Sequence, residues 1–124
     1  MDLSLLSKIV FSVALSACAQ LLLKAGMSRP SVQHGIADGM GWAGAQAIAA
    51  SPMVWLGLGL YFAGAVVWLL VLARVPVSQA YPFVGLGFVL VMLLGWALQG
   101  DVISPARLLG TLLISLGVVL VARS

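Results

Sequence analysis

Four long apolar segments constrain this chain more than any other feature of its sequence. A membrane-spanning helix needs about 20 mostly apolar residues, and such stretches occur at about 5–25, 53–73, 77–98 and 106–122. Only 7% of the residues are charged, against about 25% in an ordinary soluble domain. Because lipid offers no partner to a free backbone amide, each stretch should be an α-helix. We therefore predict an all-α membrane protein, with residues 1–124 forming a single domain of four transmembrane helices.

Two of the predicted spans begin at a serine followed by a proline, Ser51-Pro52 and Ser104-Pro105. A serine at the N-cap can accept a hydrogen bond from a backbone amide of the first helical turn. Proline suits the first helical position, where its missing N–H leaves no hydrogen bond unmade. Both pairs therefore mark helix starts.

The longest loop, residues 28–50, separates the first two spans. Its glycines lower helix propensity. Several apolar residues nevertheless fall near one helical face: Ile36, Met40, Ala43 and Ala47. A short helix lying at the membrane interface within residues 31–50 and an irregular loop are both compatible with this pattern.

The charges are balanced between the two sides of the membrane. With four spans, both termini and the loop between spans two and three share one side. That side carries Lys8, Arg74 and Arg123, and the other side carries Lys24, Arg29 and Arg107. Since Lys and Arg near span ends set orientation, a count of three against three leaves the orientation open. The cations are too few and too scattered for a nucleic-acid surface, so no nucleic-acid partner is expected.

A polar stripe lies inside the first span. Ser16, Gln20 and Lys24 are spaced i, i+4 and i+8, which places them on one helical face. Polar groups at membrane depth usually face protein or a water-filled cavity. The alternatives are that Lys24 snorkels to the headgroups, Gln20 bonds another helix and Ser16 bonds its own backbone. We interpret the stripe as part of a binding site. Another reading, a lipoprotein signal at Leu15-Ser16-Ala17-Cys18, conflicts with the apolar run that continues beyond it.

The stripe carries a cation and no acid. The three carboxylates, Asp2, Asp38 and Asp101, all lie outside the predicted spans. A lysine at the membrane edge attracts an anionic headgroup such as a phosphate, because it acts as a point charge. The stripe therefore favours an anionic ligand over an organic cation.

The third span begins with an irregular sequence, VPVSQAYPFVGLGF at residues 75–88. Pro82 removes a helical hydrogen bond and disfavours helix at the residue before it. Gly85 and Gly87 permit bending or the close approach of another helix. Discontinuous segments of transporters often lie at binding sites, so we predict a hinge at Pro82, Gly85 and Gly87. The alternative is a simple proline kink.

These motifs resemble those of a known group of proteins. V-P-V-S-Q-A-Y-P, together with S-x-x-x-Q-x-x-x-K in the first span, resembles the small subunits of the undecaprenyl-phosphate-aminoarabinose flippase. G-W-A-L-Q-G, followed by P-A-R-L-L-G-T-L-L-I-S-L-G-V-V-L, is similar to the small multidrug resistance family. Both belong to the drug/metabolite transporter superfamily. The resemblance implies a small-multidrug-resistance-like bundle in the bacterial inner (cytoplasmic) membrane that moves a polyprenyl-phosphate-linked sugar by alternating access.

Two departures separate this chain from the multidrug relatives. Those relatives carry a glutamate where this chain has Ser16, and usually a tryptophan where it has Val84. The resemblance thus disfavours export of cationic drugs. An amphiphilic substrate needs a polar pocket for its phosphate and sugar, and six polar residues could supply it: Ser16, Gln20, Lys24, Ser78, Gln79 and Tyr81. Tyr61 is interpreted as structural.

The fourth span contains small residues at Gly110, Ser115 and Gly117. Small residues let helices approach closely, and the segment resembles the dimer helix of the multidrug relatives. Four short helices enclose little space for a lipid headgroup. We therefore predict a homodimer, or a heterodimer with a similar small subunit, with these three residues at the interface.

Two other functions compete with the flippase reading. One is a proton-coupled exporter of small cations or drugs, and the other is a non-transporting assembly subunit of a larger membrane complex. An enzyme is not expected, because the only histidine, His34, stands alone in a loop. No cofactor and no metal site are expected, and the partners are the glycolipid and the surrounding membrane lipid.

Overall fold

The structure, a computed structural model, describes residues 3–39 and 41–124. Within those ranges it contains helices and no strand. In chain order the elements are α1 (Leu3–Met27), α2 (Pro30–Ala37), α3 (Trp42–Ala49), α4 (Pro52–Leu72), α5 (Val77–Ala80), the 3-10 turn η1 (Tyr81–Phe83), α6 (Val84–Gln99) and α7 (Pro105–Arg123). Four helical segments are long and apolar enough to cross a membrane: Leu3–Met27, Pro52–Leu72, Val77–Gln99 and Pro105–Arg123. The prediction of an all-α protein with four membrane-spanning helices is confirmed.

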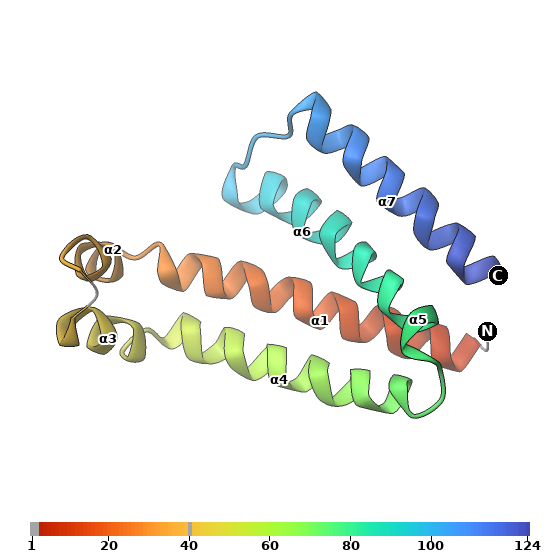
Figure 1. The fold of residues 1–124 in the computed structure, drawn as a ribbon. Helices are drawn as coiled ribbons and strands as arrows, with labels where there is room; N and C mark the ends of the chain where they lie inside the picture. The colour runs from red at the N-terminus through yellow and green to blue at the C-terminus, as the bar shows by residue number, and fades with distance from the viewer. Residues whose placement is uncertain (1–2, 40) are drawn as a thin grey trace.

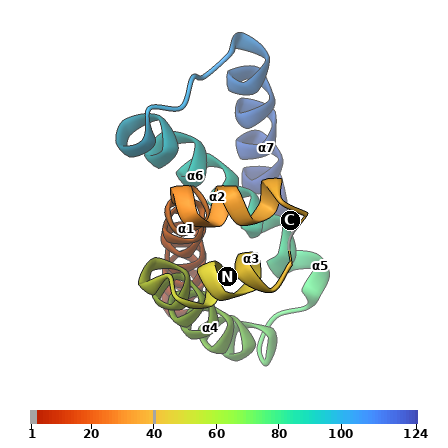
Figure 2. The ribbon, with the colours of Figure 1, turned by 90° about the vertical axis from the view of Figure 1, so that its left-hand side faces the viewer.

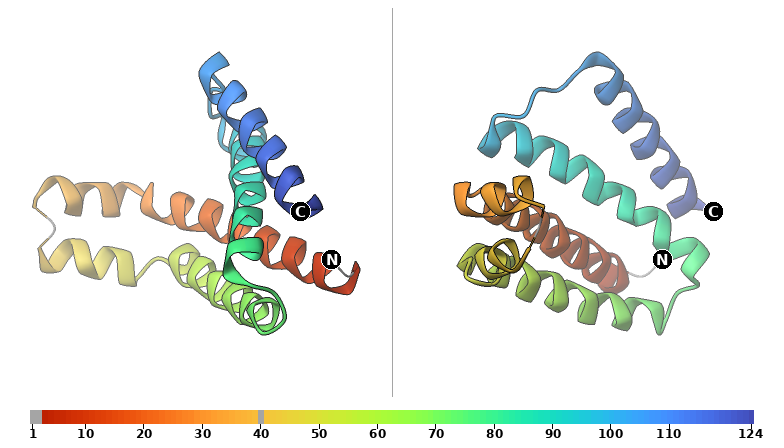
Figure 3. Two further views of the ribbon diagram at one scale, coloured as in Figure 1. Left: turned by 45° about the vertical axis from the view of Figure 1, so that its right-hand side comes forward. Right: turned by 60° about the vertical axis from the view of Figure 1, so that its left-hand side comes forward.

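The helix α1 is the centre of the arrangement. It packs against α4 on one side and against α6 on the other, while α7 packs mainly against α6 and η1 (Figures 1 and 2). Contacts between α4 and α6 are sparse. The helices α6 and α7 lie closest together near η1. The distance between them increases toward the first residues of α7 (Figure 3). The fold is thus a tight α1–α4 pair with a looser α6–α7 pair beside it.

Small residues at heptad spacing hold α1 and α4 together. Ser12, Ala19 and Gly26 on α1 are buried, and so are Gly57 and Gly64 on α4. A Cβ atom at Gly64 would lie 3.2 Å from the carbonyl oxygen of Ser12. The Ser12 hydroxyl donates a hydrogen bond of 2.7 Å to the carbonyl oxygen of Gly64. We call these five residues the α1–α4 seam, and the close approach depends on their small size.

An apolar core cluster lies at the end of the molecule where α1 begins and α7 ends. There, the first half of α1, the end of α4, α5, η1 and the end of α7 converge. The buried members are Ile9, Val13, Val71, Val75, Ala80, Phe83 and Val118. Many other large apolar side chains point outward, as expected of helices whose solvent is lipid.

Two short helices, α2 and α3, occupy the longest loop. They lie side by side across the ends of α1 and α4, at the end away from the termini (Figures 1 and 2). A side chain at Gly35 would collide with the backbone of Gly44, so the two glycines permit this contact. Gly39 has φ +94°, a left-handed conformation that suits glycine and reverses the chain.

The segment is therefore neither one interfacial helix nor an irregular loop. Because the chain turns at Gly39, the residues predicted to share one helical face are divided between two helices. Ile36 lies on α2, whereas Ala43 and Ala47 lie on α3, and Met40 is outside the described residues.

The two serine–proline pairs behave differently. Both serines are the N-cap residues of their helices, and both prolines occupy the first turn. The Ser104 hydroxyl accepts a 3.1 Å hydrogen bond from the backbone N–H of Arg107, as predicted. The Ser51 hydroxyl makes no capping bond, and its oxygen is buried without a partner. The prediction that both pairs mark helix starts is confirmed, and the side-chain capping bond forms at Ser104 but not at Ser51.

Pro82 tightens the third span without ending it. The helix passes from α5 through η1 into α6, so the missing N–H of Pro82 falls within a single 3-10 turn. The two glycines of the predicted hinge serve different neighbours. A Cβ atom at Gly85 would lie 2.6 Å from Ile114 Cγ2 of α7, whereas one at Gly87 would lie 3.4 Å from Val13 Cγ1 of α1. Gly85 is thus required for the close approach of α7, and the hinge motion stays a prediction.

Candidate functional site

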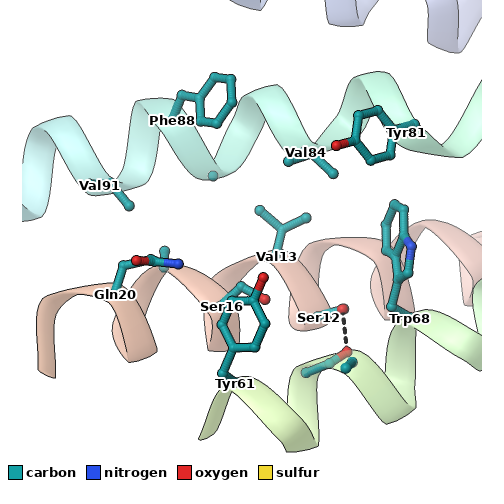
Figure 4. A pocket seen from close by; sticks show the side chains of 14 residues that line it. Ser12, Val13, Ser16, Gln20, Tyr61, Trp68, Tyr81, Val84, Phe88 and Val91 are labelled. Atoms are coloured by element: carbon teal, nitrogen blue, oxygen red, sulfur yellow. Dashed lines mark hydrogen bonds between the residues drawn. The ribbon is translucent and has the colours of Figure 1, made fainter. Parts of the chain in front are cut away.

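A cavity of about 350 Å³ lies between α1, α4 and the start of the third span. We call it the polar cavity after its few hydrogen-bonding side chains, although most of its lining is apolar. Its lining comprises Ser12, Val13, Ser16, Ala17, Gln20, Tyr61, Gly64, Ala65, Trp68, Tyr81, Val84, Gly87, Phe88 and Val91. Figure 4 shows α1 and α4 forming one wall and α6 the opposite wall. It exists because α4 and α6 make few contacts with each other.

The polar groups of the cavity are hydroxyls and an amide. Ser16 and Gln20 come from α1, Tyr61 from α4 and Tyr81 from η1. None of these four side chains makes a hydrogen bond to another described residue, so all can bind a ligand. The Ser12 hydroxyl, in contrast, is engaged with the carbonyl oxygen of Gly64 (Figure 4). Ser12 therefore holds the wall together, and Ser16 offers the free hydroxyl.

Aromatic rings form a large part of the lining. Tyr61 extends from α4 toward Ser16, and Trp68 extends past α1 toward the third span (Figure 4). Phe88 and Tyr81 belong to the opposite wall, and both are more than half exposed. Rings with polar edges beside an amide and hydroxyls suit a ligand that has both apolar faces and hydrogen-bonding groups.

No ionisable acid or base other than tyrosine lines the cavity within the described part of the chain. The described residues also contain no group of three His, Cys, Asp or Glu side chains that could hold a metal ion. Binding in the cavity therefore depends on hydrogen bonds and ring contacts.

Lys24 lies just outside the cavity. It is one helical turn beyond Gln20, about 6 Å farther along the axis of α1. Its side chain is exposed and makes no hydrogen bond or ion pair with another described residue. Lys24 is thus free to bind an anion beside the cavity or to reach the lipid headgroups.

The structure brings together only some of the predicted substrate-binding residues. Ser16, Gln20 and Tyr81 line the polar cavity, and so does Gly87 of the predicted hinge. Ser78 and Gln79 lie on α5, outside the lining. Tyr81, the residue that follows α5, is the first residue of the third span in the lining. Ser78 and Gln79 therefore lie nearer the end of the molecule where α1 begins and α7 ends.

Sequence reasoning missed most of the α4 wall. Tyr61 was interpreted as structural, but it lines the cavity together with Gly64, Ala65 and Trp68. These residues follow an i, i+3, i+4, i+7 spacing, which places them on one helical face. That spacing groups the four residues on one face, and the buried glycines Gly57 and Gly64 are the signal that this region of α4 packs against α1.

The predicted dimer residues of α7 lie in different surroundings. A Cβ atom at Gly110 or at Gly117 would meet no atom within 4 Å in this chain. The Ser115 hydroxyl donates to the backbone oxygen of Thr111 within the same helix, at 2.9 Å. Their role at an interface stays a prediction.

Comparison with known proteins adds no family assignment. No protein-family model, no curated protein and no solved structure matches this chain. The features that bear on function are therefore the cavity, Lys24 beside it and the sequence motifs.

Proposed function

We propose that this protein moves an anionic polyprenyl-phosphate-linked sugar, an aminoarabinose-type glycolipid, across the bacterial inner membrane. The observation that carries the proposal is a cavity without formal charge between membrane-spanning helices, with an exposed lysine one helical turn beyond Gln20 of its lining. This combination suits a sugar that binds through hydrogen bonds and is joined to a phosphate, and the aromatic rings of the lining can face the protonated amine of an aminoarabinose.

The cavity suits the sugar. The Gln20 amide and the Ser16 hydroxyl can exchange hydrogen bonds with ring hydroxyls, since neither is engaged elsewhere among the described residues. Apolar faces of a sugar ring can lie against Trp68 and Tyr61, whose rings form the α4 wall. In a lipid environment such groups replace the water that the sugar gives up on entering.

Lys24 suits the phosphate. Its exposed ammonium lies about one helical turn from Gln20, so a phosphate there stays linked to a sugar in the cavity. A hydrogen bond to a charged group is roughly twice as strong as one between neutral groups. Lys24 would therefore select the anion, and the cavity would select the sugar.

Transport requires the cavity to face each side of the membrane in turn. The α1–α4 seam makes those two helices one unit, and α6 is tied to α1 by few polar contacts. Next to Gln20, the side-chain amide of Gln99 in α6 donates a 3.1 Å hydrogen bond to the backbone oxygen of Leu21 in α1. We propose that α6 and α7 move against α1 and α4, with this bond made in one state and broken in the other.

The outward face of α7 supports the proposal of a dimer. Its leucines are exposed in the single chain: Leu108, Leu109, Leu112, Leu113, Leu116 and Leu120. A second copy, or a similar small subunit, could cover this helix and enlarge the space for a headgroup.

One observation favours a second candidate, a small-cation exporter. The rings of Tyr61, Trp68, Tyr81 and Phe88 surround the polar cavity, and aromatic faces attract organic cations. Coupling to protons would need an acid, however, and no carboxylate of the described residues lines the cavity. The glycolipid therefore fits the lining better.

The test is a flipping assay in proteoliposomes with a fluorescent polyprenyl-phosphate sugar. Gln20→Leu should lower the rate about tenfold, the effect of losing hydrogen bonds worth about 1.4 kcal/mol. The matched control is Gln46→Leu, which changes an exposed glutamine of α3 outside the cavity. Equal rates in wild type and Gln20→Leu, or no flipping by wild type, would overturn the proposal.

A further inference from the structure

A second cavity, of about 370 Å³, lies between η1, α6 and α7. We call it the apolar groove. Its lining comprises Tyr81, Pro82, Val84, Gly85, Phe88, Ile114, Gly117, Val118 and Val121. Apart from the phenol oxygen of Tyr81, every lining side chain is apolar. A groove of this kind at membrane depth suits a hydrocarbon chain.

The apolar groove adjoins the polar cavity directly. Tyr81, Val84 and Phe88 line both spaces, and they share one face of the third span at i, i+3 and i+7. No helix stands between the two spaces along this face. A ligand with a polar end in the cavity can therefore place an apolar part in the groove.

Two glycines shape the groove. A Cβ atom at Gly85 would collide with Ile114, so the glycine lets α6 and α7 converge at the closed end. A Cβ atom at Gly117 would meet nothing within 4 Å, so the space next to the Gly117 backbone is part of the groove. Longer side chains at either position would remove this depression.

We propose that the apolar groove binds a stretch of the isoprenoid tail while the headgroup occupies the polar cavity, an inference that rests on the proposed function. The methyl branches of such a chain fit a surface of β-branched side chains, namely Val84, Ile114, Val118 and Val121.

The tail can reach the groove from the phosphate position. Gly87, the neighbour of Phe88 in the groove lining, faces Val13 of α1, and Lys24 is eleven residues farther along α1, about 16 Å at 1.5 Å per residue. A long polyprenyl chain anchored at Lys24 spans that distance along the lipid-facing side of α6. A chain of only two isoprene units would stop short of the groove.

The expected effect is moderate for a physical reason. The tail is already in an apolar solvent, so entering the groove gains packing contacts without a hydrophobic transfer term. Filling the groove should therefore weaken binding of a long-chain ligand by roughly threefold to tenfold, because it removes only dispersion contacts.

The test compares two variants and two ligands in nanodiscs of phosphatidylethanolamine and phosphatidylglycerol. Gly117→Leu fills the groove, and Gly110→Leu is the matched control, because Gly110 is equally open but is not part of the lining. The probes are undecaprenyl phosphate and neryl phosphate, which carry the same phosphate on a long and a short chain. Binding and oligomeric mass are read together by native mass spectrometry.

We expect Gly117→Leu to weaken only undecaprenyl phosphate and Gly110→Leu to weaken neither ligand. Unchanged chain-length preference in Gly117→Leu, or release of phospholipid in place of the probe, would overturn the groove assignment and leave the proposed function intact. Equal losses in both variants with a changed oligomeric mass would also overturn it, because both losses would then follow from disruption of the proposed subunit interface on α7. Absence of binding in wild type would contradict the proposed function itself.

Discussion

Ser12 and Gly64 join the two most closely packed helices. The Ser12 hydroxyl donates a hydrogen bond to the Gly64 carbonyl oxygen at 2.7 Å. The backbone oxygen of Ser12 would lie 3.2 Å from a Cβ atom at residue 64. The same pair borders the polar cavity, so one contact both closes the seam and fixes the wall that carries Ser16.

The seam leads to a prediction about stability. Gly64→Leu should lower the free energy of unfolding by about 1–3 kcal/mol, the usual cost of overpacking, because a Cβ atom there would lie 3.1 Å from the Ser16 hydroxyl. Thermal unfolding in detergent measures the change. The control is Gly59→Leu on the same helix, where a Cβ atom would meet nothing within 4 Å. A Gly59→Leu protein as unstable as Gly64→Leu would contradict the seam.

The two N-cap serines should respond differently to alanine. Ser104→Ala removes a hydrogen bond to the Arg107 amide and should cost about 1 kcal/mol. Ser51→Ala removes a buried hydroxyl without a partner, so stability should stay the same or rise. Chemical unfolding of both variants gives the comparison, and a larger loss in Ser51→Ala would show that its hydroxyl has a partner after all.

Lys24 should control transport without controlling folding. Because its side chain is exposed and unpaired among the described residues, Lys24→Ala should express normally. Flipping of the polyprenyl-phosphate sugar should fall at least about tenfold, since a contact between charged groups is lost. Lys24→Arg should retain part of the activity. The control is Lys8→Ala, an exposed lysine near the other end of α1; equal flipping by Lys24→Ala and Lys8→Ala would exclude the assigned role.

A cross-link between α1 and α6 should stop transport. The Gln99 amide lies 3.1 Å from the backbone oxygen of Leu21. In a Cys18→Ser background, Leu21→Cys and Gln99→Cys joined by a short thiol reagent should hold the third span against α1. A reducible reagent should block flipping, and reduction should restore it. Full activity of the cross-linked protein would show that this end of the cavity need not open.

The sequence predicted the spans well because their signal is local. Apolar stretches of sufficient length must be helical in lipid, whatever their neighbours are. The α2–α3 hairpin was not predicted, because the reversal at Gly39 and the contact between Gly35 and Gly44 depend on backbone geometry that composition does not reveal.

The candidate site was predicted only in part, for a reason of the same kind. The stripe in the first span indicated Ser16 and Gln20 correctly as lining residues, because helical periodicity alone places them on one face. Which face of α4 would meet that stripe depends on the seam, so Tyr61 and Trp68 could not be assigned from periodicity alone. Gly57 and Gly64 in α4 were the overlooked indication of that packing.

The α2–α3 hairpin lies at one end of the molecule, so the two ends have different surfaces. Two copies inserted in the same sense would carry both hairpins on one side of the membrane, where they could touch. Two copies inserted in opposite senses would display one hairpin on each surface. A protease or antibody directed at α3 on intact vesicles would therefore report the relative orientation of the subunits. Full or no accessibility would indicate copies inserted in the same sense, and half accessibility would indicate copies inserted in opposite senses.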